Sequence, residues 1–185
     1  MSQTFKDNGY LIIPKILSGE LLDFIGIYAY NKARIEGINP DDYQIPNTPS
    51  FGYDYVMENL SDFLLPKIES AAGMKLLPTY TYFRVYKAGD ILKKHRDRPA
   101  CEISISLCAR KKGKIWPIYI NNTAIMLEEG DAVLYRGCEV DHWREPYTEG
   151  TKQAQVFLHY VDANGPYTEW KNDKKTNDKY FARDK

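Results

Sequence analysis

The chain has 185 residues, 43% of them hydrophobic, and its 25 basic and 25 acidic residues give a formal net charge of zero. This length suits one domain with a substantial core, and the hydrophobic fraction excludes a disordered chain. A neutral chain has no global field to draw it onto nucleic acid or anionic lipid, although basic residues are in local excess between positions 84 and 114.

The cysteines and the hydropathy pattern indicate the compartment. Cys101, Cys108 and Cys138 form no CxxC pair, and an odd number of cysteines fits a reducing environment. Residues 1–8 lack the apolar stretch of a signal peptide, and no apolar run reaches the roughly 18 residues of a membrane span. We therefore predict a cytoplasmic protein without a membrane partner.

Residues 1–75 carry signals for one strand and two helices. Ser18 is a suitable N-cap before apolar residues at helical spacing, and Gly73 is a suitable stop after a second such stretch. We expect a strand at 9–14, a helix at 19–34, a loop at 39–53 and a helix at 55–72.

From residue 76 to residue 162 the sequence becomes rich in β-branched and aromatic residues, interrupted by turn residues about every ten positions. This pattern predicts a mainly β (α+β) protein with a sandwich or barrel core, in one domain over 1–185 with a polar tail at 163–185. The expected strands are 79–86, 91–97, 101–109, 115–120, 124–127, 132–135 and 153–161. Lys111–Lys114 is expected to be a hairpin turn.

The motif His95-Arg96-Asp97 contains one of only three histidines in the chain. Side chains two residues apart on a strand point to one face, so His95 and Asp97 can hold the same metal ion. Two imidazoles and one carboxylate form the facial triad of non-haem Fe(II), with the other metal face open. His142 is the expected third ligand. His159 lies in an apolar strand, where we expect a core or pocket-wall residue.

The order of motifs around His142 resembles that of the 2-oxoglutarate and Fe(II)-dependent dioxygenases, particularly the prolyl 4-hydroxylase-like branch. His142 follows a strand entered through Gly130-Asp131, and Gly150-Thr151-Lys152 comes about ten residues later. The resemblance spans roughly residues 80–160. It implies a double-stranded β-helix (a jelly-roll or cupin-like barrel) with the N-terminal helices packed on the outside.

The resemblance also implies roles for individual residues. His95, Asp97 and His142 would bind Fe(II), while Lys152 would pair with the distal carboxylate of 2-oxoglutarate and Tyr86 would hydrogen-bond this co-substrate. Arg84 is the next candidate if Lys152 does not bind it. Leu92 stands where prolyl hydroxylases often have a tyrosine, so co-substrate binding is expected to differ in detail.

The activity implied is oxidative decarboxylation of 2-oxoglutarate to succinate and CO2, coupled to hydroxylation by O2, with ascorbate as a candidate additional reductant. An Asp at position 97 favours hydroxylation over halogenation. The substrate stays open among a peptidyl proline, an amino acid and a small metabolite. Residues just after the ligands are expected at the substrate entrance: Arg98, Trp143 and Arg144.

Three other functions compete with this interpretation. A cupin-type metal protein would share the β core without needing 2-oxoglutarate, and the Lys152 element speaks against it. A nucleic-acid demethylase of the same superfamily would need a basic groove with stacking aromatics, which zero net charge disfavours. A non-catalytic domain would not need the complete triad.

Overall fold

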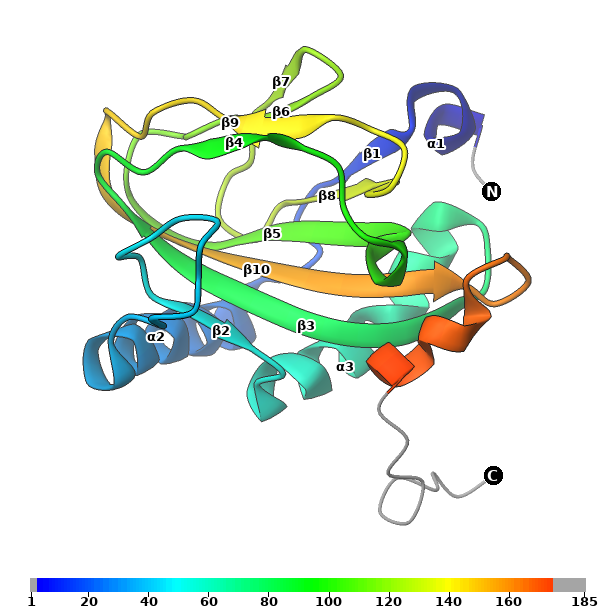
Figure 1. Cartoon of the computed structure of the whole chain (residues 1–185), viewed down its shortest axis with the longest axis horizontal. Coiled ribbons are helices and arrows are strands. Elements are labelled where there is room, and N and C mark those ends of the chain that lie inside the picture. The colour runs from blue at the N-terminus through cyan, green and yellow to red at the C-terminus, as the bar shows by residue number, and fades with distance from the viewer. Residues whose placement is uncertain (1–2, 175–185) are drawn as a thin grey trace.

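The computed structural model describes residues 3–174, and its centre is a pair of antiparallel sheets that face each other (Figure 1). The larger sheet has six strands in the order β1-β8-β5-β10-β3-β2, and the smaller has four in the order β4-β9-β6-β7. The predicted mainly β fold, a double-stranded β-helix, is confirmed, although the two sheets do not close into a barrel. The extent of the single domain stays a prediction.

The strands vary widely in length. Those of the larger sheet are β1 (Tyr10–Ile13), β2 (Ser50–Gly52), β3 (Leu76–Lys87), β5 (Ile103–Gly113), β8 (Ala132–Tyr135) and β10 (Gly150–Asp162). Those of the smaller sheet are β4 (Leu92–His95), β6 (Ile118–Ile120), β7 (Thr123–Ile125) and β9 (His142–Arg144). The long strands β3 and β10 pair along most of their length and lie side by side in the larger sheet.

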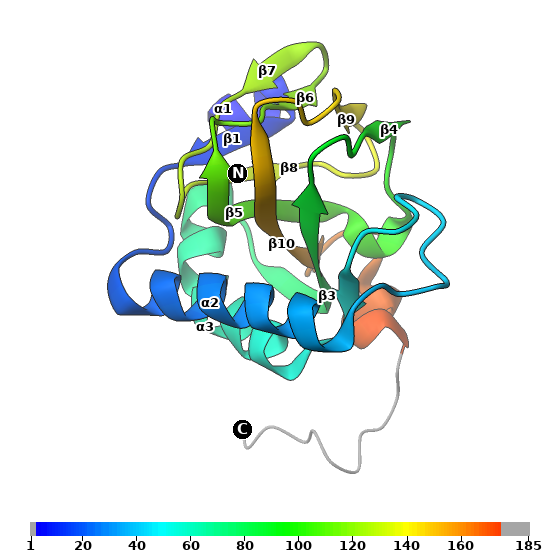
Figure 2. The same ribbon diagram turned by 90° about the vertical axis from the view of Figure 1, so that its left-hand side faces the viewer.

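Helices cover the outer face of the larger sheet (Figures 1 and 2). They are α2 (Gly19–Glu36) and α3 (Tyr55–Ala72), while the short α1 (Gln3–Asn8) lies beside β1. The carboxylate of Asp54 caps α3 by accepting hydrogen bonds from the amides of Val56 and Met57. The helix ends at Gly73, whose positive φ of 65° suits a residue without Cβ.

The two faces of β10 show why the sheet separates a core from a cavity. Ala154, Val156 and Leu158 point toward the helices and are fully buried in the main core. The alternate residues, such as Phe157 and His159, point into the space between the sheets and line a cavity there. The face that holds the site is therefore set by the register of this strand.

Several details differ from the sequence-based expectations. The strand predicted at 91–97 ends at His95, so Asp97 lies just beyond it, and the helix α1 was not predicted. The turn predicted at Lys111–Lys114 is wrong, because β5 continues to Gly113 and pairs with β10 through the backbone while its charged side chains reach solvent. The short strands β2 and β9 were not predicted. Ser18 begins α2 but makes no side-chain capping bond.

The structure describes the first part of the predicted polar tail. The 3-10 helix η2 (Thr168–Lys174) packs against β3 and β10, close to the short 3-10 helix η1 (Pro99–Cys101). The rest of that tail lies outside the described residues. No helix between residues 3 and 174 is long and apolar enough to cross a membrane.

Candidate metal centre

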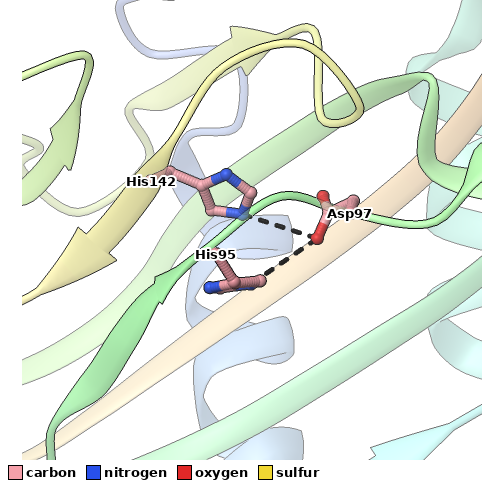
Figure 3. Close-up of side chains that lie close together, drawn as sticks. All are labelled: His95, Asp97 and His142. Carbon is pink, nitrogen blue, oxygen red and sulfur yellow. Dashed lines mark ion pairs between the residues drawn. The ribbon is translucent and has the colours of Figure 1, made fainter.

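The structure brings together the three residues of the predicted triad (Figure 3). His95 ends β4 and His142 begins β9, and the pairing of these strands sets the two residues opposite each other, with ring centroids 4.3 Å apart. Oδ1 of Asp97 lies 3.6 Å from Nε2 of His95 and 3.4 Å from Nε2 of His142. Bonds of about 2.1 Å to one ion at angles of 90–110° would separate neighbouring ligand atoms by roughly 3.0–3.4 Å. The triad therefore fits a single metal ion with little rearrangement.

Hydrogen bonds fix which nitrogen of each imidazole faces the metal. Nδ1 of His95 lies 2.7 Å from the carbonyl oxygen of Lys93, and Nδ1 of His142 lies 3.1 Å from that of Val140. A carbonyl oxygen only accepts, so each Nδ1 carries the proton and each Nε2 keeps its lone pair. Both lone pairs are thus available on the side of Asp97.

The electrostatics of the site favour the ligand forms of His95 and Asp97. Burial, together with the neighbouring His142, lowers the pKa of His95 and keeps its imidazole neutral. Burial alone would raise the pKa of Asp97, but the neighbouring histidines, His142 foremost, hold it below its usual value. A neutral imidazole and an ionised carboxylate are the states that bind a divalent ion.

The triad lines a cavity of about 440 Å³ between the two sheets. This volume lies in the range of small-molecule sites. Of the other predicted site residues, Tyr86 and Arg98 also line this cavity. The aromatic part of its wall consists of Tyr80, Tyr82, Tyr86, Tyr135 and Phe157.

Lys152 is not brought to this cavity. Its side chain is exposed, and along β10 it has the same orientation as Ala154, on the face turned away from the metal centre. Its neighbours across the sheet are Lys87 and Lys112. The inward positions next to it are occupied by Gln153 and Gln155, so the predicted role of Lys152 has no support from its position.

The predicted entrance residues are also separated from one another. Trp143 lies on the outer face of the smaller sheet, stacked on Tyr119 with ring centroids 5.2 Å apart. Arg144 points inward and is fully buried. Arg98 does line the cavity, but its guanidinium binds the carboxylate of Asp173 at 2.7 and 3.0 Å.

Two buried arginines, Arg84 and Arg144, lie close together, which the sequence analysis did not predict. Arg84 is only 1% exposed. Its Nη2 donates hydrogen bonds to Asp42, Gln44 and Tyr82. Its Nε and Nη1 have no hydrogen-bond partner. Arg144 donates from Nη1 to the carbonyl of Trp116, and its Nε has no partner. Within residues 3–174, Arg144 forms no ion pair with a carboxylate.

Tyr86 lies between these two cations. The guanidinium carbons of Arg84 and Arg144 are 5.6 and 5.9 Å from the centre of its ring. Only Arg84 of this pair has an acidic partner, Asp42, and a second buried positive charge beside it is costly unless an anion joins the two arginines. The alternation along β9 could have indicated Arg144, because it lies two residues after His142 and so shares its face.

A segment of the predicted loop closes over the metal centre. The amide nitrogen Nε2 of Gln44 lies 3.3 Å from Nε2 of His95, and its oxygen Oε1 accepts from Arg84 at 3.2 Å. Figure 2 shows this segment beside β4, and several of its residues line the cavity. Gln44 therefore contacts both the metal-binding nitrogen and one of the buried cations.

Comparison with known proteins adds the identity of the fold. No protein-family model matches the sequence, and no curated protein matches it. The non-haem α-ketoglutarate-dependent carbocyclase SnoK from nogalamycin biosynthesis superposes with a TM-score of 0.70 over 88% of this chain and 85% of that chain, at 13% identity. A prolyl-4-hydroxylase from Pseudomonas putida gives 0.62 over 87% and 96%, at 15% identity.

A third match is EctD from S. alaskensis with bound Fe, which gives a TM-score of 0.69 over 92% of this chain and 81% of that chain, at 14% identity. These identities establish a likeness of fold. The chain has the fold shared by α-ketoglutarate-dependent enzymes and prolyl 4-hydroxylases.

Proposed function

We propose that this protein is a non-haem Fe(II) dioxygenase that couples the oxidative decarboxylation of 2-oxoglutarate to the hydroxylation of a small-molecule or peptide substrate. The observation that supports it most is the convergence of Nε2 of His95, Nε2 of His142 and Oδ1 of Asp97 at one cavity. Fe(II), 2-oxoglutarate and O2 supply the oxidising chemistry when bound. The cytoplasm is the proposed compartment, in keeping with three free cysteines.

The chain's own contribution begins with orientation of the ligands. His95 and His142 donate from Nδ1 to backbone carbonyls and are thereby held with Nε2 toward the metal position. Because all three ligands come from one side, the opposite face of a bound ion would open into the cavity. The aromatic side chains of the cavity wall would border that face.

The buried cations are the proposed anchor for the distal carboxylate of 2-oxoglutarate. Arg144 follows His142 by two residues on the same face of β9, a separation of roughly 6.8 Å along a strand. A buried guanidinium without a carboxylate partner is stabilised by an anionic ligand. Tyr86, between Arg144 and Arg84, lines the cavity and can contribute its hydroxyl. We therefore assign the anchor to Arg144, with Arg84 and Tyr86 beside it, in place of Lys152.

The proposal is tested with Fe(II)-loaded protein supplied with 2-oxoglutarate and O2. Succinate formation should depend on the protein and fall to background in His142→Ala, whose fold is checked by circular dichroism. Adding metabolite and peptide pools should then reveal products heavier by one oxygen, and parallel reactions with ascorbate test the additional reductant. If the wild type neither binds 2-oxoglutarate in calorimetry nor forms succinate with any pool, the proposed function is wrong.

A further inference from the structure

His159, the third histidine of the chain, resembles His95 and His142 in having its Nδ1 engaged in a hydrogen bond. Nδ1 of His159 lies 2.9 Å from the hydroxyl of Ser104. That hydroxyl also contacts two pure acceptors, the carbonyl of Cys101 at 3.1 Å and Oδ2 of Asp97 at 3.5 Å. The single hydroxyl proton of Ser104 serves these acceptors, so Nδ1 of His159 is the donor to Ser104.

The free nitrogen of His159 therefore carries a lone pair. Only 6% of His159 is exposed, and its side chain lines the cavity. Its Nε2 has no hydrogen-bond partner among the described residues. Because His159 lines the cavity, this lone pair is available to a ligand bound there.

The two oxygens of Asp97 face two different groups of ligands. Oδ1 faces His95 and His142, whereas Oδ2 lies on the side of Ser104. Gly137 packs directly against Oδ2, where a Cβ would come within 2.5 Å of it. This contact holds the carboxylate in the orientation that divides its oxygens.

Cys101 completes the second group. It is 98% buried, and its Sγ lies 3.2 Å from the hydroxyl of Tyr80 on the cavity wall. One ligand atom each from Asp97, Cys101 and His159 can be chosen so that all lie within 4.8 Å of one another. Bonds of about 2.0–2.3 Å to one ion need ligand atoms closer together than this limit, so the three side chains would draw together when they bind it.

We propose that Asp97, Cys101 and His159 form a second metal site, adjacent to the triad and bridged to it by the Asp97 carboxylate. One sulfur, one nitrogen and one oxygen ligand suit a zinc-like ion, whereas the triad, without sulfur, suits Fe(II). On binding, the thiol of Cys101 releases its proton to solvent and coordinates as thiolate. An ion in this second site occupies the cavity wall beside the triad and so competes with substrate for that space.

Anaerobic titration with Co(II) tests the second site, because thiolate coordination gives Co(II) a near-ultraviolet charge-transfer band that imidazole and carboxylate do not. Wild type should bind two equivalents by equilibrium dialysis and show the band. Cys101→Ser should bind one equivalent without the band. Cys138→Ser, which removes a thiol outside the site, is the matched control and should behave as wild type.

Two further variants separate this site from the triad. His159→Gln should weaken the second equivalent at least tenfold and leave the first unchanged. His142→Ala should lose the triad equivalent and keep the thiolate band, so failure of the proposed oxygenase function would not remove this signal. The proposal is overturned if wild type binds a single equivalent without the band, or if the band persists in Cys101→Ser.

Discussion

Substitution of Arg144 by methionine is the sharpest test of how the co-substrate is held. The variant removes a guanidinium that is fully buried and has an unpartnered Nε, and replaces it by an apolar side chain of similar length. A hydrogen bond to a charged group contributes about 1.5–3 kcal/mol. At about 1.4 kcal/mol per factor of ten, its loss should weaken 2-oxoglutarate binding about 10- to 150-fold.

Calorimetric titration of 2-oxoglutarate into the metal-loaded protein measures this effect. Co(II) affinity should stay unchanged, and the melting temperature should not fall, because replacing an unpaired buried charge by an apolar group is often neutral or stabilising. Lys152→Met is the matched control: its exposed side chain faces away from the cavity, so co-substrate affinity should match the wild type. Normal affinity in Arg144→Met with loss of affinity in Lys152→Met would refute the assignment and restore the sequence-based one.

Three further predictions concern residues around the site. Gln44→Ala should tighten Co(II) binding about two- to tenfold in a metal titration, because the amide no longer competes for the lone pair of His95. Burial would raise the pKa of Asp42, but its hydrogen bonds with Ser50 and Tyr82 and its ion pair with Arg84 lower it below 3.8. Asp42 therefore stabilises the fold above pH 3.8, and this stabilisation is lost as the pH falls through the lowered pKa of the folded state. Asp42→Asn should reduce the decrease of the melting temperature at acidic pH, measured by thermal unfolding. Trp143→Ala should lower stability by about 1 kcal/mol in urea unfolding through the lost stacking on Tyr119, without changing succinate formation.

The three residues that the structure brings together as a candidate metal centre could be chosen from the sequence because their spacing is local. His95 and Asp97 are two residues apart, and only two other histidines compete for the third position. The strand pairing that sets His95 opposite His142 was not needed to choose them. The fold class was also predictable, since turn residues punctuate the β-rich segment at regular intervals.

The choice of residues for the proposed anion anchor depends on facts that a single sequence does not display. Lys152 was chosen by its distance from His142 along the chain, but strand register decides which face a side chain occupies, and a shift of one residue reverses it. Gln153, the next residue, points inward instead. Arg144 was expected at the entrance because β9 was not predicted. Within that strand Arg144 and Trp143 point to opposite faces of the sheet, so Arg144 lies inside and Trp143 outside.

The contacts of Gln44 imply that the metal centre and the anion anchor respond to one another. One nitrogen lone pair cannot accept a hydrogen bond from Gln44 and also bind a metal, so loading the triad must release the amide from His95. The same amide accepts from Arg84, and Asp42, two residues away in the same loop, binds that guanidinium at 2.6 Å. If the amide turns away from His95, its contact with Arg84 is broken as well and a donor of Arg84 becomes free. We therefore expect a metal ion to favour anion binding, and by linkage we expect 2-oxoglutarate to tighten metal binding by the same factor.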